Sequence, residues 1–122
     1  MIRIFKQRTS KPTKIPNKED LYWAAGFLEG EGSFTNPNNS EQARASQADD
    51  NKEPLIKLQE LFGGSIYHKS REKQRKQGKN YKDQIEWGLY GARARGLMMT
   101  LYVLLGPIKQ EQIRNSLKNE KQ

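Results

Sequence analysis

The chain shows helical spacing of apolar residues in four separate segments. In the first, apolar residues recur every three or four positions, at Leu21, Ala24, Ala25 and Leu28. Asn17 is a good N-cap for this helix, which is expected to run to about Gly30. The same criterion predicts further helices over residues 52–62, 92–105 and 108–118. Glycine follows two of them, at Gly63 and at Gly106, as is typical of helix ends.

Alternation of apolar and polar residues predicts the strands. Over residues 84–90 one face collects the apolar side chains, which are Ile85, Trp87 and Leu89. Further strands are expected over 33–36, 43–48 and 65–70, with a turn at 37–39. This order of elements predicts an α+β fold, in which one four-stranded antiparallel sheet carries the helices on one face. We expect a single domain over residues 17–122, preceded by a flexible basic tail over residues 1–16.

The sheet face opposite the helices is predicted to be polar. The residues placed there are Thr35, Arg44, Ser46, Tyr67, Lys69, Arg71, Gln84 and Glu86. Such side chains suit a sheet that lies in the major groove of DNA, where they can reach base edges. The alternative is an ordinary sheet that faces solvent.

The charge balance narrows the choice of partner. The 122 residues hold 22 Lys+Arg and 14 Asp+Glu, for a net charge of +8. This excess favours nucleic acid over an acidic membrane, since no basic amphipathic helix stands out; a lysine-rich soluble protein is the remaining alternative. A basic loop is expected to follow the phosphate backbone or simply to be solvated, and it includes Arg71, Lys73, Arg75 and Lys76. No apolar stretch is long enough to span a bilayer, and the N-terminus lacks a secretory signal, which suggests a cytoplasmic or genome-associated protein.

The titratable residues limit the possible chemistry. Cysteine is absent, and His68 is the only histidine, which argues against a zinc site or a histidine-dependent triad. Glu29 and Glu31 flank a glycine where the first helix ends, and two acids at such a point suggest a site for a hard divalent cation. Gly26 and Gly30 share one helix face, so a second helix can approach that face closely.

The segment Ala24–Gly32 resembles the LAGLIDADG motif of homing endonucleases. Ala25 and Gly26 match the motif's Ala-Gly, Glu29 and Glu31 match its two acids, and Gly32 matches its last glycine. The resemblance extends over residues 20–118, with weaker matches at 62–67, 87–97 and 104–112. It implies an αββαββα fold with a saddle-shaped sheet. Because the motif occurs once, it also implies a homodimer that packs through the motif helix at Ala25, Gly26, Glu29 and Gly30.

The resemblance further implies a site-specific endonuclease that hydrolyses both strands of a long pseudo-palindromic DNA target. By this comparison Glu31 is the essential metal ligand, the Gly30 carbonyl assists, and the ion is Mg²⁺ or another divalent cation such as Mn²⁺ or Ca²⁺. Lys109 falls where the family keeps a basic residue near the scissile phosphate, and Gln47 where relatives often carry a glutamine that organises water. No small-molecule substrate is expected, and the gene would belong to a mobile element such as an intron or a phage insertion.

Two alternatives to cleavage remain open at this point. One is a cleavage-inactive module with the same fold, which assists RNA splicing or regulates DNA. Asp49 and Asp50 favour it, because relatives often carry a basic residue just beyond this position, whereas the intact Glu31 favours cleavage. The other is a protein that uses the motif helix only to dimerise and binds no nucleic acid.

Overall fold

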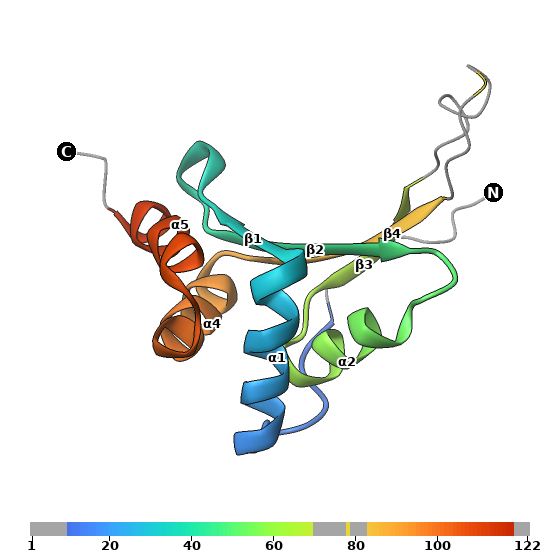
Figure 1. The fold of residues 1–122 in the computed structure, drawn as a ribbon, viewed down its shortest axis with the longest axis horizontal. Coiled ribbons are helices and arrows are strands. Elements are labelled where there is room, and N and C mark those ends of the chain that lie inside the picture. The colour runs from blue at the N-terminus through green and yellow to red at the C-terminus, as the bar shows by residue number, and fades with distance from the viewer. Residues whose placement is uncertain (1–9, 70–77, 79–82, 119–122) are drawn as a thin grey trace.

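The computed structural model describes residues 10–69, 78 and 83–118. In this part of the chain the elements are α1 (Lys18–Glu31), β1 (Gly32–Thr35), η1 (Pro37–Asn39), β2 (Gln42–Ala48), α2 (Glu53–Phe62), β3 (Ser65–Lys69), β4 (Gln84–Tyr90), α4 (Ala92–Leu101), η2 (Tyr102–Leu104) and α5 (Pro107–Leu117). Figure 1 shows α1, α2 and α4 beneath the sheet, with α1 below its middle, and α5 at the left end of the sheet.

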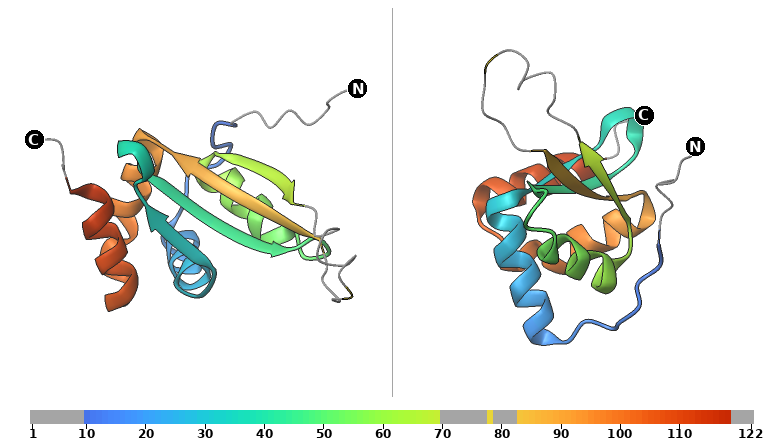
Figure 2. Two further views of the ribbon diagram at one scale, coloured as in Figure 1. Left: turned by 90° about the horizontal axis from the view of Figure 1, so that it is seen from above. Right: turned by 90° about the vertical axis from the view of Figure 1, so that its right-hand side faces the viewer.

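The four strands form one sheet in the order β1-β2-β4-β3, and every neighbouring pair is antiparallel. The register places Gly32 opposite Ala45, and both Ser46 and Tyr67 opposite Glu86. In the right-hand view of Figure 2, α1 (blue) and α2 (green) lie below this sheet. The predicted α+β fold with a four-stranded antiparallel sheet is therefore confirmed.

The core lies between the sheet and the helices and centres on Trp87, which is fully buried in β4. The indole Nε1–H donates to the Gly63 carbonyl at 2.9 Å, so the polar atom of this buried ring is satisfied. Gly63 has a φ of +83°, and a Cβ there would lie 2.6 Å from the Ser10 carbonyl oxygen. A glycine is therefore required where α2 turns into β3.

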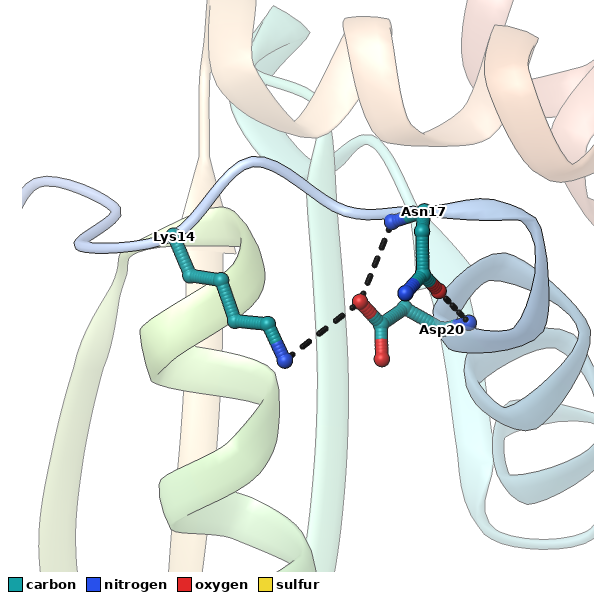
Figure 3. Close-up of polar contacts among 3 residues, drawn as sticks. All are labelled: Lys14, Asn17 and Asp20. Atoms are coloured by element: carbon teal, nitrogen blue, oxygen red, sulfur yellow. Dashed lines mark hydrogen bonds and ion pairs between the residues drawn. The ribbon is translucent and has the colours of Figure 1, made fainter.

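Reciprocal hydrogen bonds fix the start of α1. The Asp20 N–H donates to Asn17 Oδ1 at 2.8 Å, and the Asn17 N–H donates to Asp20 Oδ2 at 3.0 Å. Figure 3 shows this pair together with Lys14, whose Nζ lies 3.6 Å from Asp20 Oδ2. The hydrogen bond from Asn17, assisted by the Lys14 charge, holds the pKa of Asp20 below its ordinary value. The predicted N-cap at Asn17 is confirmed.

A second acid joins the sheet to α4. Glu41, just before β2, is buried and forms an ion pair with Arg95 of α4. The hydrogen bond from Arg95 and one from the backbone lower the pKa of the Glu41 carboxyl. The Gly91 N–H also donates to the Glu41 carbonyl at 2.9 Å, so this corner is held by both backbone and side chain.

Two boundaries differ from the sequence-based expectations. The helix predicted to reach residue 105 ends at Leu101 and tightens into the 3₁₀ turn η2, after which Leu105 becomes extended and is buried. Toward the N-terminus of the chain, Ser10 exchanges two 2.9 Å backbone hydrogen bonds with Gly64. This residue of the predicted tail is therefore bonded to the domain. Among the described helices, none has the length and apolar character needed to cross a membrane.

Candidate functional site

The end of α1 presents a free carboxylate. Glu31 is the last residue of the helix and is exposed, and none of the described residues pairs with its side chain. Gly32 follows directly, and a Cβ there would lie 2.9 Å from the Leu28 carbonyl oxygen, so the backbone at this junction favours glycine. The last carbonyls of a helix lack partners within it and carry its negative dipole end. The Glu31 carboxylate and the Gly30 carbonyl therefore provide oxygen ligands suited to a hard divalent cation.

Lys109 reaches the same point from the other end of the chain. It lies in the first turn of α5, and its Nζ donates to the Gly32 carbonyl oxygen at 2.5 Å. The ammonium group therefore stands one residue from Glu31, although the two residues are far apart in sequence. The structure thus places a cation beside the predicted metal-binding carboxylate.

Glu29, the first acid of the motif, is engaged within its own chain. Its Oε1 accepts a hydrogen bond of 2.8 Å from the Gly106 N–H, and Gly106 is the N-cap of α5. A carboxylate at a helix N-terminus also interacts favourably with the helix dipole. Glu29 therefore holds α5 against α1, and through α5 it helps to place Lys109.

Gln47 lies near this site along the sheet. It is two residues beyond Ala45, the Cα partner of Gly32, which corresponds to about 7 Å along a strand. Its Nε2 donates to the Ser46 carbonyl at 2.9 Å, and its Oε1 accepts from Asn51 Nδ2 at 2.6 Å. The amide is thus bonded to its own strand and turn in this state of the molecule.

The exposed side of α1 is lined by small residues. A Cβ added at Gly26 or Gly30 would meet nothing within 4 Å, so no described part of the chain covers these positions. Tyr22, one turn before Gly26 on the same side, is 55% exposed and was not predicted from the sequence as part of an interface. Ala25 is instead buried in the core of its own chain. Of the predicted interface residues, Gly26 and Gly30 are thus open to a partner, while Glu29 is bonded to Gly106.

The sheet face away from the helices is polar. Ile85, Trp87 and Leu89 are buried against the helices, so the alternating positions of β4 and their cross-strand partners point to the other face. On that face lie Thr35, Arg44, Ser46, Tyr67, Lys69, Gln84 and Glu86. The other predicted DNA contacts, Arg71, Lys73, Arg75 and Lys76, lie outside the described residues.

Glu86 is the centre of a charged network on this face and is only 5% exposed. Lys69 Nζ lies 3.2 Å from its Oε1, and Arg44 Nε lies 3.2 Å from its Oε2, in an ion pair without the alignment of a hydrogen bond. Burial tends to lower the pKa of Arg44, but Glu86 and two tyrosines outweigh it and raise that pKa. Burial and the Glu86 charge raise the pKa of Tyr67, so its hydroxyl stays protonated. The face therefore presents fixed cations and hydrogen-bonding groups.

A third cluster of polar side chains lies just beyond the C-terminal end of β2. The structure brings together Asp49, His68 and Asp83, whose candidate ligand atoms lie within 4.8 Å of one another. The sequence pattern gave no sign that His68 has two acidic neighbours. The three residues follow or belong to different strands, so only the strand register could have brought them together.

Comparison with known proteins identifies the fold. No protein-family model and no curated protein sequence matches this chain. Among solved structures, the homing endonuclease I-CvuI, bound to its target in the presence of Ca, matches with a TM-score of 0.59 at 16% identity, over 80% of this chain and 65% of its own. The intron-encoded homing endonuclease I-CeuI, complexed with DNA, gives 0.62 at 16% identity, over 84% and 55%. The homing endonuclease I-TnaI gives 0.51 at 18% identity, over 83% and 69%.

The chain therefore has the fold of the LAGLIDADG homing endonucleases, as the segment Ala24–Gly32 indicated. It spans slightly under two thirds of the I-CvuI chain and about half of the I-CeuI chain. At these identities the likeness establishes the fold, and the activity has to be argued from the site.

Proposed function

We propose that this protein is a metal-dependent, site-specific DNA endonuclease that acts as a homodimer and cuts both strands of a pseudo-palindromic duplex. The observation that carries the proposal is the position of Lys109, whose ammonium group contacts the Gly32 carbonyl beside the free Glu31 carboxylate. A carboxylate, helix-end carbonyls and a cation together match the needs of phosphodiester hydrolysis. The DNA-bound structures of I-CvuI and I-CeuI support the choice of duplex DNA as partner.

The candidate residues of each chain have distinct roles in this reaction. Glu31 and the Gly30 carbonyl would hold the cation, for which Mg²⁺ is our first choice, with Mn²⁺ or Ca²⁺ as possible occupants. When bound, this ion supplies charge neutralisation at the phosphate and a more acidic water. The Lys109 ammonium group stabilises negative charge that develops on the phosphate oxygens. The Gln47 amide, released from Asn51, would orient a water molecule near the same point.

The open side of α1 supports the proposed dimer. Gly26 and Gly30 leave a surface without side chains, so a second α1 can pack there almost backbone to backbone, with the exposed Tyr22 at its margin. A twofold axis at this surface would bring two copies of Glu31 close together, one for each DNA strand. One motif per chain then suffices for a double-strand cut.

The polar sheet face supplies the DNA contacts in this proposal. Two such faces related by a twofold axis would read the two half-sites of a pseudo-palindrome. Arg44 suits a guanine edge, while Thr35, Ser46 and Gln84 offer neutral hydrogen-bonding groups to bases or phosphates. A gene product of this kind fits a mobile genetic element, either intron-encoded or free-standing.

The test is cleavage of a randomised duplex library in the presence of Mg²⁺, with sequencing of the cut ends. We expect ends enriched around one near-palindromic sequence, and no cutting by Glu31→Gln. The matched control is Glu19→Gln, which removes the same charge from the exposed first turn of α1 and should cut like the parent. Equal cutting by Glu31→Gln would refute the proposed ligand.

A cleavage-inactive binding module is the second candidate. Two observations favour it: the acidic pair Asp49 and Asp50 close to the end of β2, and the engagement of the Gln47 amide with Asn51. In that case the parent and Glu31→Gln would retain the same DNA or RNA sequences with equal affinity, and neither would cut. A protein that only dimerises would retain neither nucleic acid.

A further inference from the structure

The cluster of Asp49, His68 and Asp83 joins the ends of three strands. Asp49 follows β2, His68 belongs to β3, and Asp83 precedes β4. His68 Nε2 lies 3.4 Å from Asp49 Oδ2 and 3.9 Å from Asp83 Oδ2. The Asp49 N–H donates to the Asp83 carbonyl at 3.0 Å, so the backbone holds the two carboxylates side by side. One imidazole and two carboxylates thus converge on a single point.

We propose that this cluster is a second cation site, distinct from the Glu31 site, and that it binds a divalent transition ion such as Zn²⁺. Around a Zn²⁺ ion with bonds of about 2.0–2.2 Å, neighbouring ligand atoms lie roughly 3.0–3.5 Å apart. The candidate ligand atoms already lie within 4.8 Å of one another, and the side chains are between 25% and 50% exposed, so small rotations close the site. Imidazole beside carboxylates favours Zn²⁺ over Mg²⁺, which prefers oxygen ligands and water.

Charge gives a reason for such an ion to bind. Asp49 and Asp83 place two carboxylates next to each other, and like charges at this separation repel. A divalent cation at the centre would balance both carboxylates and use the imidazole lone pair of His68. Three protein ligands leave further coordination positions for water.

Access and position also fit a separate site. Asp49 and His68 line a hollow of about 470 Å³, together with Lys52, Ile56, Ile66, Tyr67 and Ile85, so an ion and its water ligands can enter. His68 lies on β3, and β3 is three inter-strand spacings, or about 14 Å across the sheet, from β1, which directly follows Glu31. An ion here would therefore lie well away from Glu31 and would clip together the strand ends on either side of residues 70–82.

The experiment uses the untagged full-length protein, stripped of metal, and a titration with ZnCl₂ alone. Because His68 is the only histidine, its imidazole resonances are the only ones of their kind in the NMR spectrum. We expect them to move and to saturate at one equivalent of Zn²⁺. We also expect Tm to rise by at least about 5 °C when free Zn²⁺ exceeds Kd roughly a hundredfold.

Four variants decide the assignment. Asp83→Asn and His68→Asn should each weaken Zn²⁺ binding about tenfold or more, while Asp50→Asn, which removes a charge next to Asp49, should bind nearly as the parent does. Glu31→Gln should keep full Zn²⁺ affinity. The Zn²⁺ site can therefore be refuted while the proposed endonuclease activity stands, and the endonuclease activity can be refuted while the Zn²⁺ site stands. Two results would overturn it: an imidazole signal unmoved by Zn²⁺, or equal affinity in Asp83→Asn and Asp50→Asn. The Tm of each variant without metal shows whether it is folded. If His68→Asn does not fold, Asp83→Asn alone tests the site.

Discussion

The Lys109 ammonium group is held between two elements, and its chemistry depends on that position. It donates to the Gly32 carbonyl from α5, next to Glu31 at the end of α1. We predict that Lys109→Met lowers kcat by about 10²–10³-fold with little change in KM, because its charge acts mainly as negative charge develops on the phosphate. Single-turnover cleavage of the target duplex measures the effect. Lys118→Met removes the same charge at the far end of α5 and should leave kcat unchanged.

Glu29 is predicted to stabilise the fold rather than to bind metal. It accepts the Gly106 N–H at the start of α5, so Glu29→Ala should cost about 1 kcal/mol in the free energy of unfolding. Glu29→Gln keeps an acceptor oxygen at the same reach and should cost much less. Chemical denaturation of both variants separates these cases. Equal losses for Ala and Gln would show that the negative charge, not the hydrogen bond, matters at this position.

Only some residues of the candidate site could be predicted from the sequence alone. Glu31 and Lys109 are recognisable as candidates from the resemblance, because each lies in a matching segment. Their neighbours are not: Gly106 lies against Glu29 only because α5 returns to α1, far along the chain. His68 is the clearest failure, since a single histidine gave no reason to expect Asp49 and Asp83 beside it. Such contacts depend on strand register, which a local pattern does not encode.

At the scale of elements, the two glycines on the open side of α1 have no evident role within a single chain. Gly26 and Gly30 weaken a helix, and no described residue uses the space beside them. We predict that Gly26→Leu gains up to about 1 kcal/mol of intrinsic helix stability and yet destroys the dimer, because its side chain prevents close approach of the second helix. Analytical ultracentrifugation of the variant should show a folded monomer.

The matched control for this variant lies on another helix. Gly96, in the interior of α4, is also exposed, and a Cβ there would meet nothing within 4 Å. Gly96→Leu should therefore gain similar helix stability and keep the dimer. If Gly26→Leu remains dimeric at the same protein concentration as the parent, the dimer does not pack through this side of α1.

Two acidic residues that join parts of the fold through hydrogen bonds should make the thermal stability of the protein depend on pH. The pKa values of Asp20 and Glu41 lie below their ordinary values of 3.8 and 4.5, because each carboxylate accepts hydrogen bonds in the folded state. The unfolded chain therefore takes up protons first as pH falls, and this stabilisation, present at neutral pH, is lost through the folded-state pKa values. We predict a falling Tm between about pH 5 and about pH 3.

The measurement is thermal unfolding across that range, compared between the parent and a double variant, Asp20→Asn with Glu41→Gln. The double variant should have a lower Tm at neutral pH and a flatter dependence on acid. Replacing two exposed acids, Glu19 and Glu60, by glutamine serves as the control and should leave the acid dependence nearly unchanged. A double variant as steep as the parent would assign the acid loss to other groups.

Helices and strands were predicted well where one of their faces is buried. They were predicted less well where contacts with adjacent elements determine the secondary structure. The alternation in β4 gave its correct faces because its apolar side chains all meet the helices. The strand β2 has a sequence of poor strand propensity, QARASQA, yet it forms because β1 and β4 pair with it on both edges. The end of α4 was misplaced because apolar residues continue past Leu101, and periodicity does not reveal the change to a 3₁₀ turn.

At the scale of the whole molecule, the net charge of +8 and its distribution make different predictions for DNA binding. If charge alone attracts the polyanion, any lost lysine should weaken binding equally. If the polar sheet face carries the contact, Lys69 should matter more than Lys18, which lies at the end of α1 remote from the sheet in Figure 1. Lys69 is the sharper choice because Glu86 already holds it on that face.

We predict that DNA affinity falls steeply with salt, and that Lys69→Gln reduces the slope of log K against log salt by about one, the value for one lost phosphate contact. Lys18→Gln removes the same charge and should leave the slope of the parent. Fluorescence anisotropy with a labelled duplex, without divalent metal, measures binding separately from cleavage. Equal slopes for the two variants would place the contact elsewhere, and a parent affinity independent of salt would rule out a phosphate-binding surface altogether, whatever the fold.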